Sequence, residues 1–336
     1  TTPCLFPKGD GLPGCHTPCG HLHRPMHIQK FSHHPYLSYT HLPMSELRIA
    51  GIMRAGAYSP NHIGNDAAIF NGTIEQLRKR GMIVTVYNEE QLAAGQVTEP
   101  VIINMCREQR SIDILQAKED AGCLVINSGY GIQNCMRERM TRILLGNNIP
   151  YPDSVIANTN EAVKGALAKA GIERCWIKRG ESHSQHKEDV CYVRHAEEAQ
   201  EVLQEYFLRG IKRAVINRHL EGDLIKFYGI QGSPYFFWFY PFDNGHSKYG
   251  YEEINGKSHN LPFDLAELRR ICDRASELLD VIIYGGDCIV SETGDIRIID
   301  FNDWPSFAPC RTEAAPHIAR AILKNIKAYA DKRGLK

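Results

Sequence analysis

Two polar residues near the end of the chain have the types and spacing of a site for a hard metal ion. Asp300 and Asn302 follow the apolar run Ile296–Ile299. Because side chains alternate between the two faces of a strand, both point to the same side. Carboxylate and amide oxygens without His or Cys suit Mg²⁺ that is shared with substrate phosphates. Taken alone, such a pair more often caps a turn at the end of a strand.

A β-hairpin would bring a third oxygen ligand to this pair. Two short apolar runs, 281–284 and 296–299, flank a segment that contains a Thr-Gly-Asp turn. This pattern predicts two antiparallel strands with a tight connection. Asp287 interrupts the first run, and the hairpin carries it to the same end as Asp300 and Asn302. We therefore expect these three side chains to form one metal site.

Composition excludes several classes of function. The 336 residues include 39 basic and 39 acidic side chains, and 43% of the residues are hydrophobic. No strong basic excess argues for a nucleic-acid partner, and no uninterrupted apolar run of about 18 residues is present to span a membrane. Cysteines stand singly in apolar runs, which is typical of free thiols in a reducing compartment. We expect a cytoplasmic globular protein of two or three packed units.

The first 43 residues differ in composition from the rest. They contain seven of the 15 histidines, seven of the 17 prolines and a single acidic residue. We expect a disordered leader over 1–43 and a natural start at Met44. The leader also carries side chains that bind zinc in other proteins, but their spacing does not match the usual finger patterns. These side chains are Cys15, Cys19, His21 and His23.

Strands and helices alternate from Leu47 to about residue 145, which predicts a small parallel sheet with helices on both faces. The loop after the first strand, RAGAYSPNHIGND, is long and polar. Loops that follow strands in an open parallel sheet face the ligand crevice, so this loop is expected to contact a small-molecule substrate. A solvated loop is the alternative. The candidates are Arg54, Ser59, Asn61, His62 and Asn65.

Two later stretches could serve a phosphate ligand. The strand 174–178 ends in Lys178, and the loop RGESHSQHKED connects it to an antiparallel partner at 190–193. A lysine there can reach a phosphate, although a strand-end lysine is usually only solvated. The loop could close over the phosphates with side-chain donors from Ser182, Ser184 and Lys187. The second stretch, AVINRHLEGDLIKFYGI, reads by itself as a plain hairpin with a Glu-Gly-Asp turn.

In order and spacing, these features resemble the ATP-grasp superfamily, in particular the glutathione synthetase-like fold of carboxylate-amine ligases. The resemblance rests on Lys178, the HLEGD segment, Asp287 and the motif IDFNDWP. The usual last motif of the family is Glu-x-Asn followed by Pro, and here Asp300 stands in the Glu position. A GxxxxGK[ST] loop and a GxGxxG turn after a strand are both missing, which argues against a P-loop or dinucleotide site.

The resemblance implies an α/β fold that clamps ATP. A Rossmann-like pre-ATP-grasp domain would span 44–145, and an α+β lid subdomain would span 146–210. A C-terminal mixed-sheet subdomain with the metal site would span 211–336. The cofactors would be ATP and Mg²⁺, with Mn²⁺ as a substitute.

The resemblance also implies roles for individual residues. Lys178 and Arg139 would bind phosphates, and Lys226 would meet phosphate or substrate. An extended hinge would pair its backbone with adenine, over Asn217, Arg218, His219 and Leu220. Asp223 would bind ribose, with Glu221 as its rival. Where several carboxylate ligases carry an Arg, this chain has Gly285, so the clamp on an acyl phosphate would come from Arg297 or Arg311.

The implied activity is ATP-dependent ligation, in which a carboxylate becomes an acyl phosphate that an amine or similar nucleophile attacks. Two alternatives stay open, namely a kinase of the same fold acting on a small hydroxyl compound and a nucleotide-binding module that has lost its chemistry. The expected partners are small molecules bearing a carboxylate and an amine, with no nucleic acid and no membrane. A homo-oligomer is compatible with the sequence.

Overall fold

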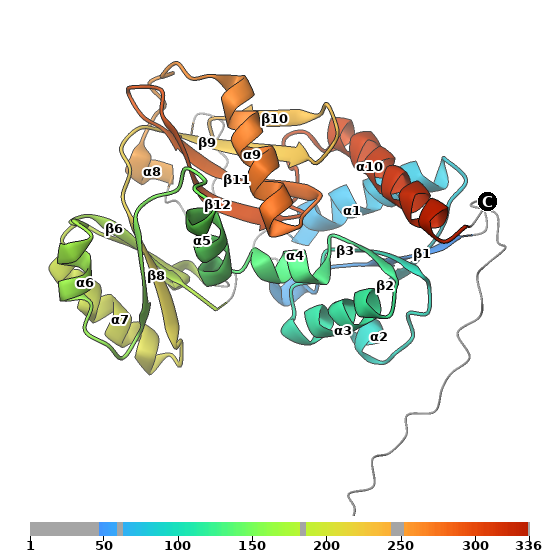
Figure 1. The fold of residues 1–336 in the computed structure, drawn as a ribbon, viewed down its shortest axis with the longest axis horizontal. Coiled ribbons are helices and arrows are strands. Elements are labelled where there is room, and N and C mark those ends of the chain that lie inside the picture. The colour runs from blue at the N-terminus through green and yellow to red at the C-terminus, as the bar shows by residue number, and fades with distance from the viewer. Residues whose placement is uncertain (1–46, 59–62, 182–185, 243–251, 335–336) are drawn as a thin grey trace, which may run out of the picture. The chain divides into compact units, whose positions relative to one another are not determined.

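The structure, a computed structural model, describes residues 47–58, 63–181, 186–242 and 252–334 (Figure 1). Strands in these residues form three sheets of four strands each. The expected leader lies outside the described residues, as do Met44 and the four candidate zinc ligands Cys15, Cys19, His21 and His23.

The first sheet is parallel, as predicted. Its strands are β1 (Arg48–Ile52), β2 (Ile83–Tyr87), β3 (Val101–Asn104) and β4 (Leu124–Ile126), in the spatial order β2-β1-β3-β4. The helices between them are α1 (Ile63–Arg78), α2 (Glu89–Ala93) and α3 (Gln109–Asp120), and α4 (Gly129–Asn134) follows β4. The last helix, α10 (Arg311–Lys332), lies beside α1 and joins the same hydrophobic core (Figure 1).

The second sheet is antiparallel and follows α5 (Arg137–Gly146). Its strands are β5 (Ser154–Asn158), β6 (Cys175–Arg179), β7 (Val190–Val193) and β8 (Arg213–Arg218), in the order β5-β8-β6-β7. Helices α6 (Lys164–Lys169) and α7 (Ala199–Leu208) pack on one face. Strand β5 is an element that the sequence analysis did not predict. Strand β8 pairs with β5 and β6 although it lies beyond residue 210, the predicted end of the lid.

The third sheet carries the predicted metal hairpin. Its strands are β9 (Asp223–Ile230), β10 (Phe236–Phe239), β11 (Ile283–Val290) and β12 (Ile296–Asp303), in the order β10-β9-β11-β12. All three pairings are antiparallel, so this sheet is not the mixed sheet that was expected. The short helix α8 (Glu252–Asn255) precedes α9 (Leu265–Leu279), whose apolar side packs on the sheet.

Local chemistry sets the limits of α9 and of the hairpin. The Asp264 carboxylate accepts hydrogen bonds from the backbone N–H of Ala266 and Glu267, which caps the start of the helix. The helix ends at Asp280, whose φ of 58° is left-handed. In the hairpin, Gly294 has a φ of 83°, a conformation that favours glycine. Strands β11 and β12 pair as the sequence predicted.

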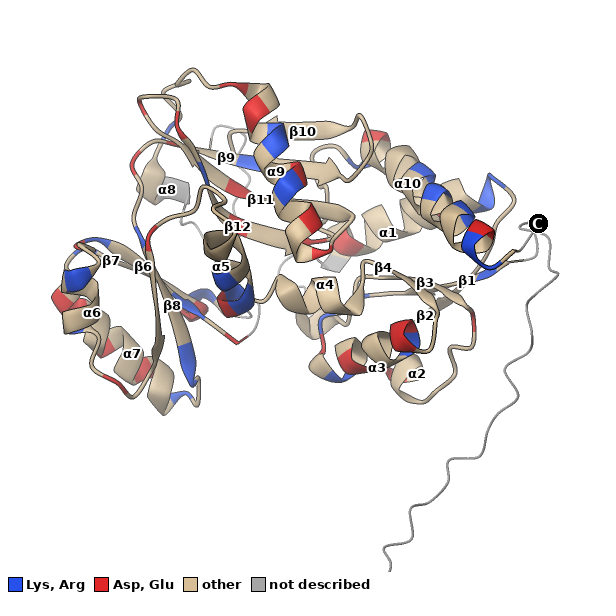
Figure 2. Ribbon diagram, viewed as in Figure 1, with Lys and Arg blue, Asp and Glu red and all other residues tan. Residues whose placement is uncertain are grey.

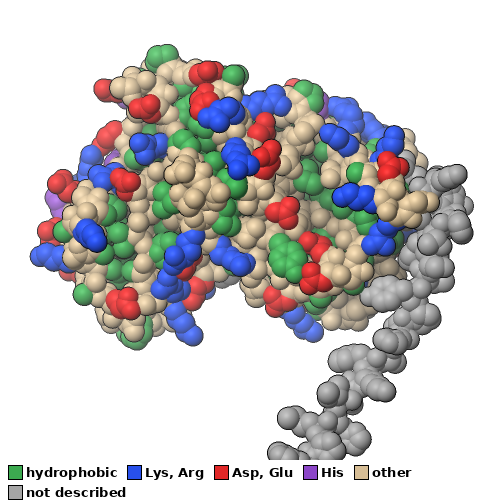
Figure 3. All heavy atoms as spheres, viewed as in Figure 1, with side chains coloured by type: hydrophobic (Ala, Val, Ile, Leu, Met, Phe, Trp, Pro, Cys, Tyr) green, Lys and Arg blue, Asp and Glu red, His purple; other side chains and the backbone are tan. Residues whose placement is uncertain are grey.

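No helix within the described residues combines the length and the apolar character that a membrane crossing requires. Acidic and basic side chains are interspersed over the face that Figure 3 shows.

Candidate active site

Three charged residues stand side by side across the third sheet. In the strand register, Asp287 of β11 lies opposite Lys226 of β9 on one side and opposite Asp300 of β12 on the other. The Lys226 ammonium donates a hydrogen bond to Asp287 Oδ1 at 2.6 Å, and both side chains are about 20% exposed. Basic and acidic positions are adjacent on β9 and β11 in Figure 2. The hairpin therefore brings the two predicted carboxylates together.

Asp300 has a second basic neighbour, which comes from α5. Arg137 Nη1 lies 3.1 Å from Asp300 Oδ1, and the Arg137 side chain is only 8% exposed. Burial alone would raise the pKa of Asp300, but the charges of Arg137, Lys178 and Lys226 outweigh it and lower the pKa below its usual value. Asp300 is thus held as a carboxylate.

Lys178 reaches the same place from β6. A β-bulge lies between Asp287 and Cys288, where Ile299 is the extra residue on β12. The Lys178 ammonium donates to the Ile299 carbonyl oxygen at 3.0 Å. Burial, assisted by the charge of Arg137, lowers the pKa of Lys178 to about 7, even though Asp300 and Asp287 act in the opposite direction.

The third predicted metal ligand, Asn302, lies opposite Gly285 on β11, and its amide helps to lower the pKa of Asp300. Among the described residues, no group of three or more His, Cys, Asp or Glu side chains is placed to hold a metal. The set Asp287, Asp300 and Asn302 differs from such a group because it has two carboxylates and an amide. Its hard oxygen donors fit a Mg²⁺ ion that takes its remaining ligands from water and phosphates.

The arginine that α5 directs at the carboxylates differs from the one predicted. Arg139 is exposed, whereas Arg137 is buried and contacts Asp300. Two residues of an α-helix correspond to a rotation of about 200°, so the two arginines face opposite sides. The apolar positions Met140 and Leu144 follow Arg137 by three and seven residues, and this spacing identifies Arg137 as the inward-facing arginine.

The two arginines proposed to clamp an acyl phosphate have other contacts. Arg297 is exposed and donates to the Tyr151 carbonyl oxygen at 3.4 Å. Arg311 donates to Asn65 Oδ1 at 3.1 Å, so it joins a residue of the predicted substrate loop. Neither contact places its guanidinium on Asp287 or Asp300.

Gly285 has no room for a side chain. An added Cβ would lie 2.6 Å from Tyr228 Cδ1 and 2.7 Å from Pro305 Cγ. This position therefore has no space for the arginine that the family resemblance would place here.

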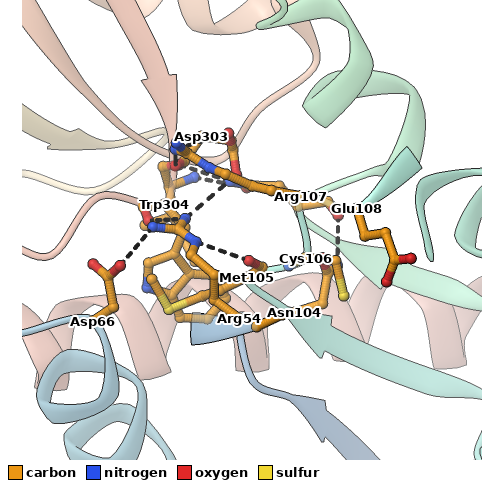
Figure 4. Close-up of polar contacts among 12 residues, drawn as sticks. Arg54, Asp66, Asn104, Met105, Cys106, Arg107, Glu108, Asp303 and Trp304 are labelled. Carbon is orange, nitrogen blue, oxygen red and sulfur yellow. Dashed lines mark hydrogen bonds and ion pairs between the residues drawn. The ribbon is translucent and has the colours of Figure 1, made fainter. Parts of the chain in front are cut away.

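The predicted substrate loop is described only in part. Ser59, Asn61 and His62 lie outside the described residues. Arg54 is 6% exposed and forms an ion pair with Asp66 at 2.9 Å. Its guanidinium also donates to the carbonyl oxygens of Met105 and Trp304, at 3.0 and 3.2 Å (Figure 4). Arg54 is therefore a buried connector rather than a side chain that extends into solvent.

The fold was compared with solved structures, and several D-alanine–D-alanine ligases match. The enzyme of Bacillus anthracis in complex with ATP superposes with a TM-score of 0.63 at 15% identity, covering 85% of this chain and 99% of that chain. The enzyme of Coxiella burnetii gives 0.61 at 12% identity, covering 86% and 97%. D-alanyl-alanine synthetase A of Vibrio cholerae gives 0.61 at 11% identity, covering 85% and 98%. The chain has the ATP-grasp fold.

This similarity is one of structure. No protein-family model and no curated protein matches the sequence. At 11 to 15% identity the comparison establishes the ATP-grasp fold, and the assignment of individual residues depends on the geometry of this chain.

The predicted adenine hinge of the ATP-grasp fold is engaged in structural contacts over its first half. Asn217 is buried, and its amide donates to Ser154 Oγ at 2.8 Å. Arg218 donates to Asp153 Oδ2 at 3.0 Å and to the Ala170 carbonyl oxygen at 2.8 Å. These contacts tie β8 to its neighbours. The backbone N–H groups of Arg218 and His219 also donate to the carbonyl oxygens of Asp153 and Arg174, each at 2.8 Å, so Leu220 is the hinge residue that stays a candidate for the N–H that meets the base.

An aromatic group beside the hinge was missed by the sequence analysis. Trp176 of β6 donates from its indole nitrogen to His219 Nδ1 at 3.1 Å. Tyr192 of β7 stands opposite Trp176, with ring centroids 5.0 Å apart, and its ring meets His219 edge-on at 5.1 Å. Trp176 is two residues before Lys178, so strand alternation places both side chains on the same face of the sheet. That alternation is the sequence signal that could have identified Trp176.

The predicted ribose ligand has a structural role. Asp223 is 2% exposed, and its two carboxylate oxygens accept backbone N–H groups of His259 and Leu261 at 2.7 and 2.8 Å. Its rival Glu221 has a side chain that is 69% exposed and pairs with Arg174 at 2.5 Å. The geometry therefore favours Glu221 for a ligand hydroxyl.

The predicted flap of the ATP-grasp fold is anchored at its base. Ser182 and Ser184 lie outside the described residues, and Lys187 lies in the short 3₁₀ helix Lys187–Asp189. The Asp189 carboxylate is fully buried and pairs with Arg209 at 2.5 Å. This ion pair fixes the point at which the segment after Lys178 returns to β7.

Proposed function

We propose that this protein is an ATP- and Mg²⁺-dependent ligase that activates a carboxylate as an acyl phosphate and joins it to an amine or a similar nucleophile. One observation carries the proposal. Three basic side chains and two carboxylates from β6, α5 and the third sheet converge at one place. The shared fold supports it, because the Bacillus anthracis structure is a D-alanine–D-alanine ligase complexed with ATP.

The basic side chains suit a triphosphate. Lys178, Arg137 and Lys226 surround Asp287 and Asp300, so the described cluster carries one more basic than acidic group when all are ionised. A carboxylate substrate and a triphosphate repel each other strongly unless positive charge lies between them. We expect these three side chains to turn toward phosphate oxygens when a nucleotide binds.

Asp287, Asp300 and Asn302 would hold Mg²⁺. The ion would neutralise charge that develops on the phosphate oxygens during transfer. The low pKa of Asp300 supports this role, because a carboxylate that stays ionised at neutral pH is available as a ligand.

The proposed reaction has two steps, phosphoryl transfer to the carboxylate and then attack by the amine. A carboxylate oxygen of the first substrate attacks the γ-phosphorus, and the bond from that phosphorus to the bridging oxygen breaks, which releases ADP. The amine of the second substrate then attacks the acyl carbon, and inorganic phosphate leaves. The amine loses a proton in this step.

The base and ribose would bind at the hinge. Trp176 and Tyr192 offer aromatic surface beside His219, and an adenine edge would pair with the backbone at Leu220. Glu221, at the exposed end of the hinge, would accept a hydrogen bond from a ribose hydroxyl.

ADP release tests the proposal. The purified protein is incubated with ATP, Mg²⁺ and a panel of small carboxylates and amines, and ADP and the coupled product are measured. Asp300→Asn keeps a hydrogen-bond acceptor for Arg137 but removes the charge, so we expect turnover to fall by at least about 100-fold. Asp295→Asn, in the exposed hairpin turn, is the control and should retain turnover. Wild-type turnover in Asp300→Asn contradicts the assigned role.

A kinase is the second candidate, favoured by the crowding at Gly285. No arginine can project from that position toward an acyl phosphate. The two activities differ in their products. A ligase sustains ADP release over repeated turnovers only when an amine acceptor is present, and it forms a bond between the two substrates, whereas a kinase forms a phosphorylated alcohol.

A further inference from the structure

Asp303 follows the proposed metal ligand Asn302 directly and ends β12. Its side chain is 1% exposed and lies opposite Tyr284 in the register of β11. Because alternate residues of a strand face opposite sides, Asp303 points away from the side that Asn302 and Asp300 face. A buried carboxylate in this place requires nearby positive charge.

That charge comes from the first sheet. Arg107 Nη2 lies 3.3 Å from both the side-chain Oδ1 and the backbone oxygen of Asp303. Arg54 Nη2 lies 3.9 Å from Asp303 Oδ2 and donates to the carbonyl oxygen of the next residue, Trp304. Figure 4 shows both guanidinium groups directed at the end of β12.

The two arginines occupy equivalent places in the parallel sheet. Arg54 follows β1 and Arg107 follows β3, and these strands are neighbours, so both loops leave the same edge of the sheet. This is the edge at which ligands of open parallel sheets bind. The arginines thus belong to the loops where the acceptor substrate is expected.

A buried glutamate fixes the two loops relative to each other. Glu89, the first residue of α2, is 2% exposed. Its Oε1 accepts the backbone N–H of Ala55 at 2.9 Å, and its Oε2 accepts that of Glu108 at 3.2 Å. Each of these N–H groups belongs to the residue that follows one of the arginines. Glu89 therefore fixes the positions of Arg54 and Arg107, the two arginines that contact Asp303.

We propose that Asp303 is a positioning residue, which sets the place of Asn302 and Asp300 through the two arginines of the acceptor loops. This inference rests on the proposed function. Asp303 and Asn302 share a peptide bond in a paired strand, so a shift of the Asp303 anchor displaces the Asn302 amide. Partners that orient metal ligands typically change metal affinity by 10- to 100-fold when they are removed.

The test compares two carboxylates that pair with the same arginine. Asp303→Asn and Asp66→Asn each remove one acidic partner of Arg54, but only Asp303 lies on β12. For each protein, the affinity for a non-hydrolysable ATP analogue is measured by calorimetry with and without Mn²⁺, and the Mn²⁺ EPR spectrum of the complex is recorded. In Asp303→Asn we expect the increase in analogue affinity caused by Mn²⁺ to fall 10- to 100-fold and the Mn²⁺ EPR spectrum to change. In Asp66→Asn we expect that increase to change less than about threefold.

The outcomes separate this inference from the proposed function. If the wild-type protein gains no affinity from Mn²⁺, the proposed function is wrong. If the wild-type protein gains affinity and Asp303→Asn gains the same, only the positioning role is wrong. If both variants lose the same Mn²⁺-dependent affinity, the effect belongs to the arginines Arg54 and Arg107 in general. This result would also contradict a specific positioning role for Asp303.

A second variant covers the case in which Asp303→Asn does not fold. Arg107→Lys keeps the positive charge but removes the planar group that meets two oxygens of Asp303. We expect the same weakening of the Mn²⁺-dependent affinity in this variant. An unchanged affinity there contradicts the proposal.

Discussion

At the scale of single residues, Lys178 has the most unusual environment in the candidate site. It is 7% exposed, and its ammonium donates to one backbone oxygen at the bulge of β12. Burial lowers the pKa of this lysine from 10.5 to about 7. Because the unfolded chain keeps the proton up to a higher pH, this group makes the folded protein more stable as pH rises from about 7 to 10.5.

The same shift predicts proton uptake on nucleotide binding. At pH 8 most of the Lys178 side chains in the free protein are neutral, whereas a phosphate favours the charged ammonium. We expect nearly one proton to be taken up per nucleotide at pH 8 and almost none at pH 6. The affinity should fall by up to about tenfold per pH unit above 7. Calorimetry in buffers of different ionisation enthalpy measures the proton count.

Lys178→Arg is the control for this prediction. Arginine stays protonated at every pH in the range, so the variant should bind the nucleotide without taking up a proton at pH 8. A wild-type proton count near zero at pH 8 would show that Lys178 keeps its ordinary pKa.

At the scale of elements, the hairpin of β11 and β12 depends on one close approach. Gly285 lies between Tyr228 of β9 and Asn302 of β12 in the strand register. An added methyl group would approach the Phe227 carbonyl oxygen at 2.9 Å as well as the Tyr228 ring and Pro305. The absence of a side chain here lets three strands and the loop after β12 pack together.

Gly285→Ala should therefore destabilise the protein by about 1–3 kcal/mol through overpacking. Denaturant unfolding measures this change. Gly165→Ala in α6 is the matched control, because an added Cβ there meets no atom within 4 Å. It should leave stability unchanged or raise it by up to about 1 kcal/mol. If both variants behave alike, the contacts of Gly285 do not limit the packing of the hairpin.

At the scale of the whole molecule, one buried amide joins the first sheet to the third. Asn127 follows β4 and is 1% exposed. Its Oδ1 accepts the backbone N–H groups of Ile282 and Ile283, each at 2.9 Å, and its Nδ2 donates to the Ile283 carbonyl oxygen at 2.7 Å. The Asn127 side chain thus fastens the entry to β11 to the parallel sheet.

Asn127→Ala removes three hydrogen bonds, so the buried backbone N–H groups of Ile282 and Ile283 and the carbonyl group of Ile283 lose their side-chain partner. Each such group costs about 1–3 kcal/mol, so we expect a loss of roughly 3 kcal/mol in the free energy of unfolding. Asn147→Ala is the control, since Asn147 is exposed and bonds only within its own helix turn. A change in that control should stay within about 0.5 kcal/mol. If Asn127→Ala lowered the free energy of unfolding by no more than this control, Asn127 would not join the two sheets.

The sequence by itself determined most element types, their order and the local pairings, with strand β5 as an exception. The parallel first sheet and the β11–β12 hairpin follow from periodicities of two and 3.6 residues, which are properties of neighbouring positions. The short turn fixes the register from the pair Val290 and Ile296 to the pair Cys288 and Ile298, and the bulge at Ile299 then shifts the pairing by one residue, so that Asp287 faces Asp300. The ATP-grasp fold was predicted from a resemblance to that superfamily, carried by Lys178, the HLEGD segment, Asp287 and IDFNDWP, and the comparison with solved structures agrees.

Only the tertiary structure decided which polar residues point at one another. Arg137 and Asp300 are 163 residues apart, and their contact depends on how α5 packs against β12. The same holds for Asp223, which a distant loop binds through its backbone, and for Asp303, which arginines of the first sheet surround. Sequence periodicity reports which face of an element is buried. It carries no information on the charge of the surface that this face will meet, because that surface is made by other elements.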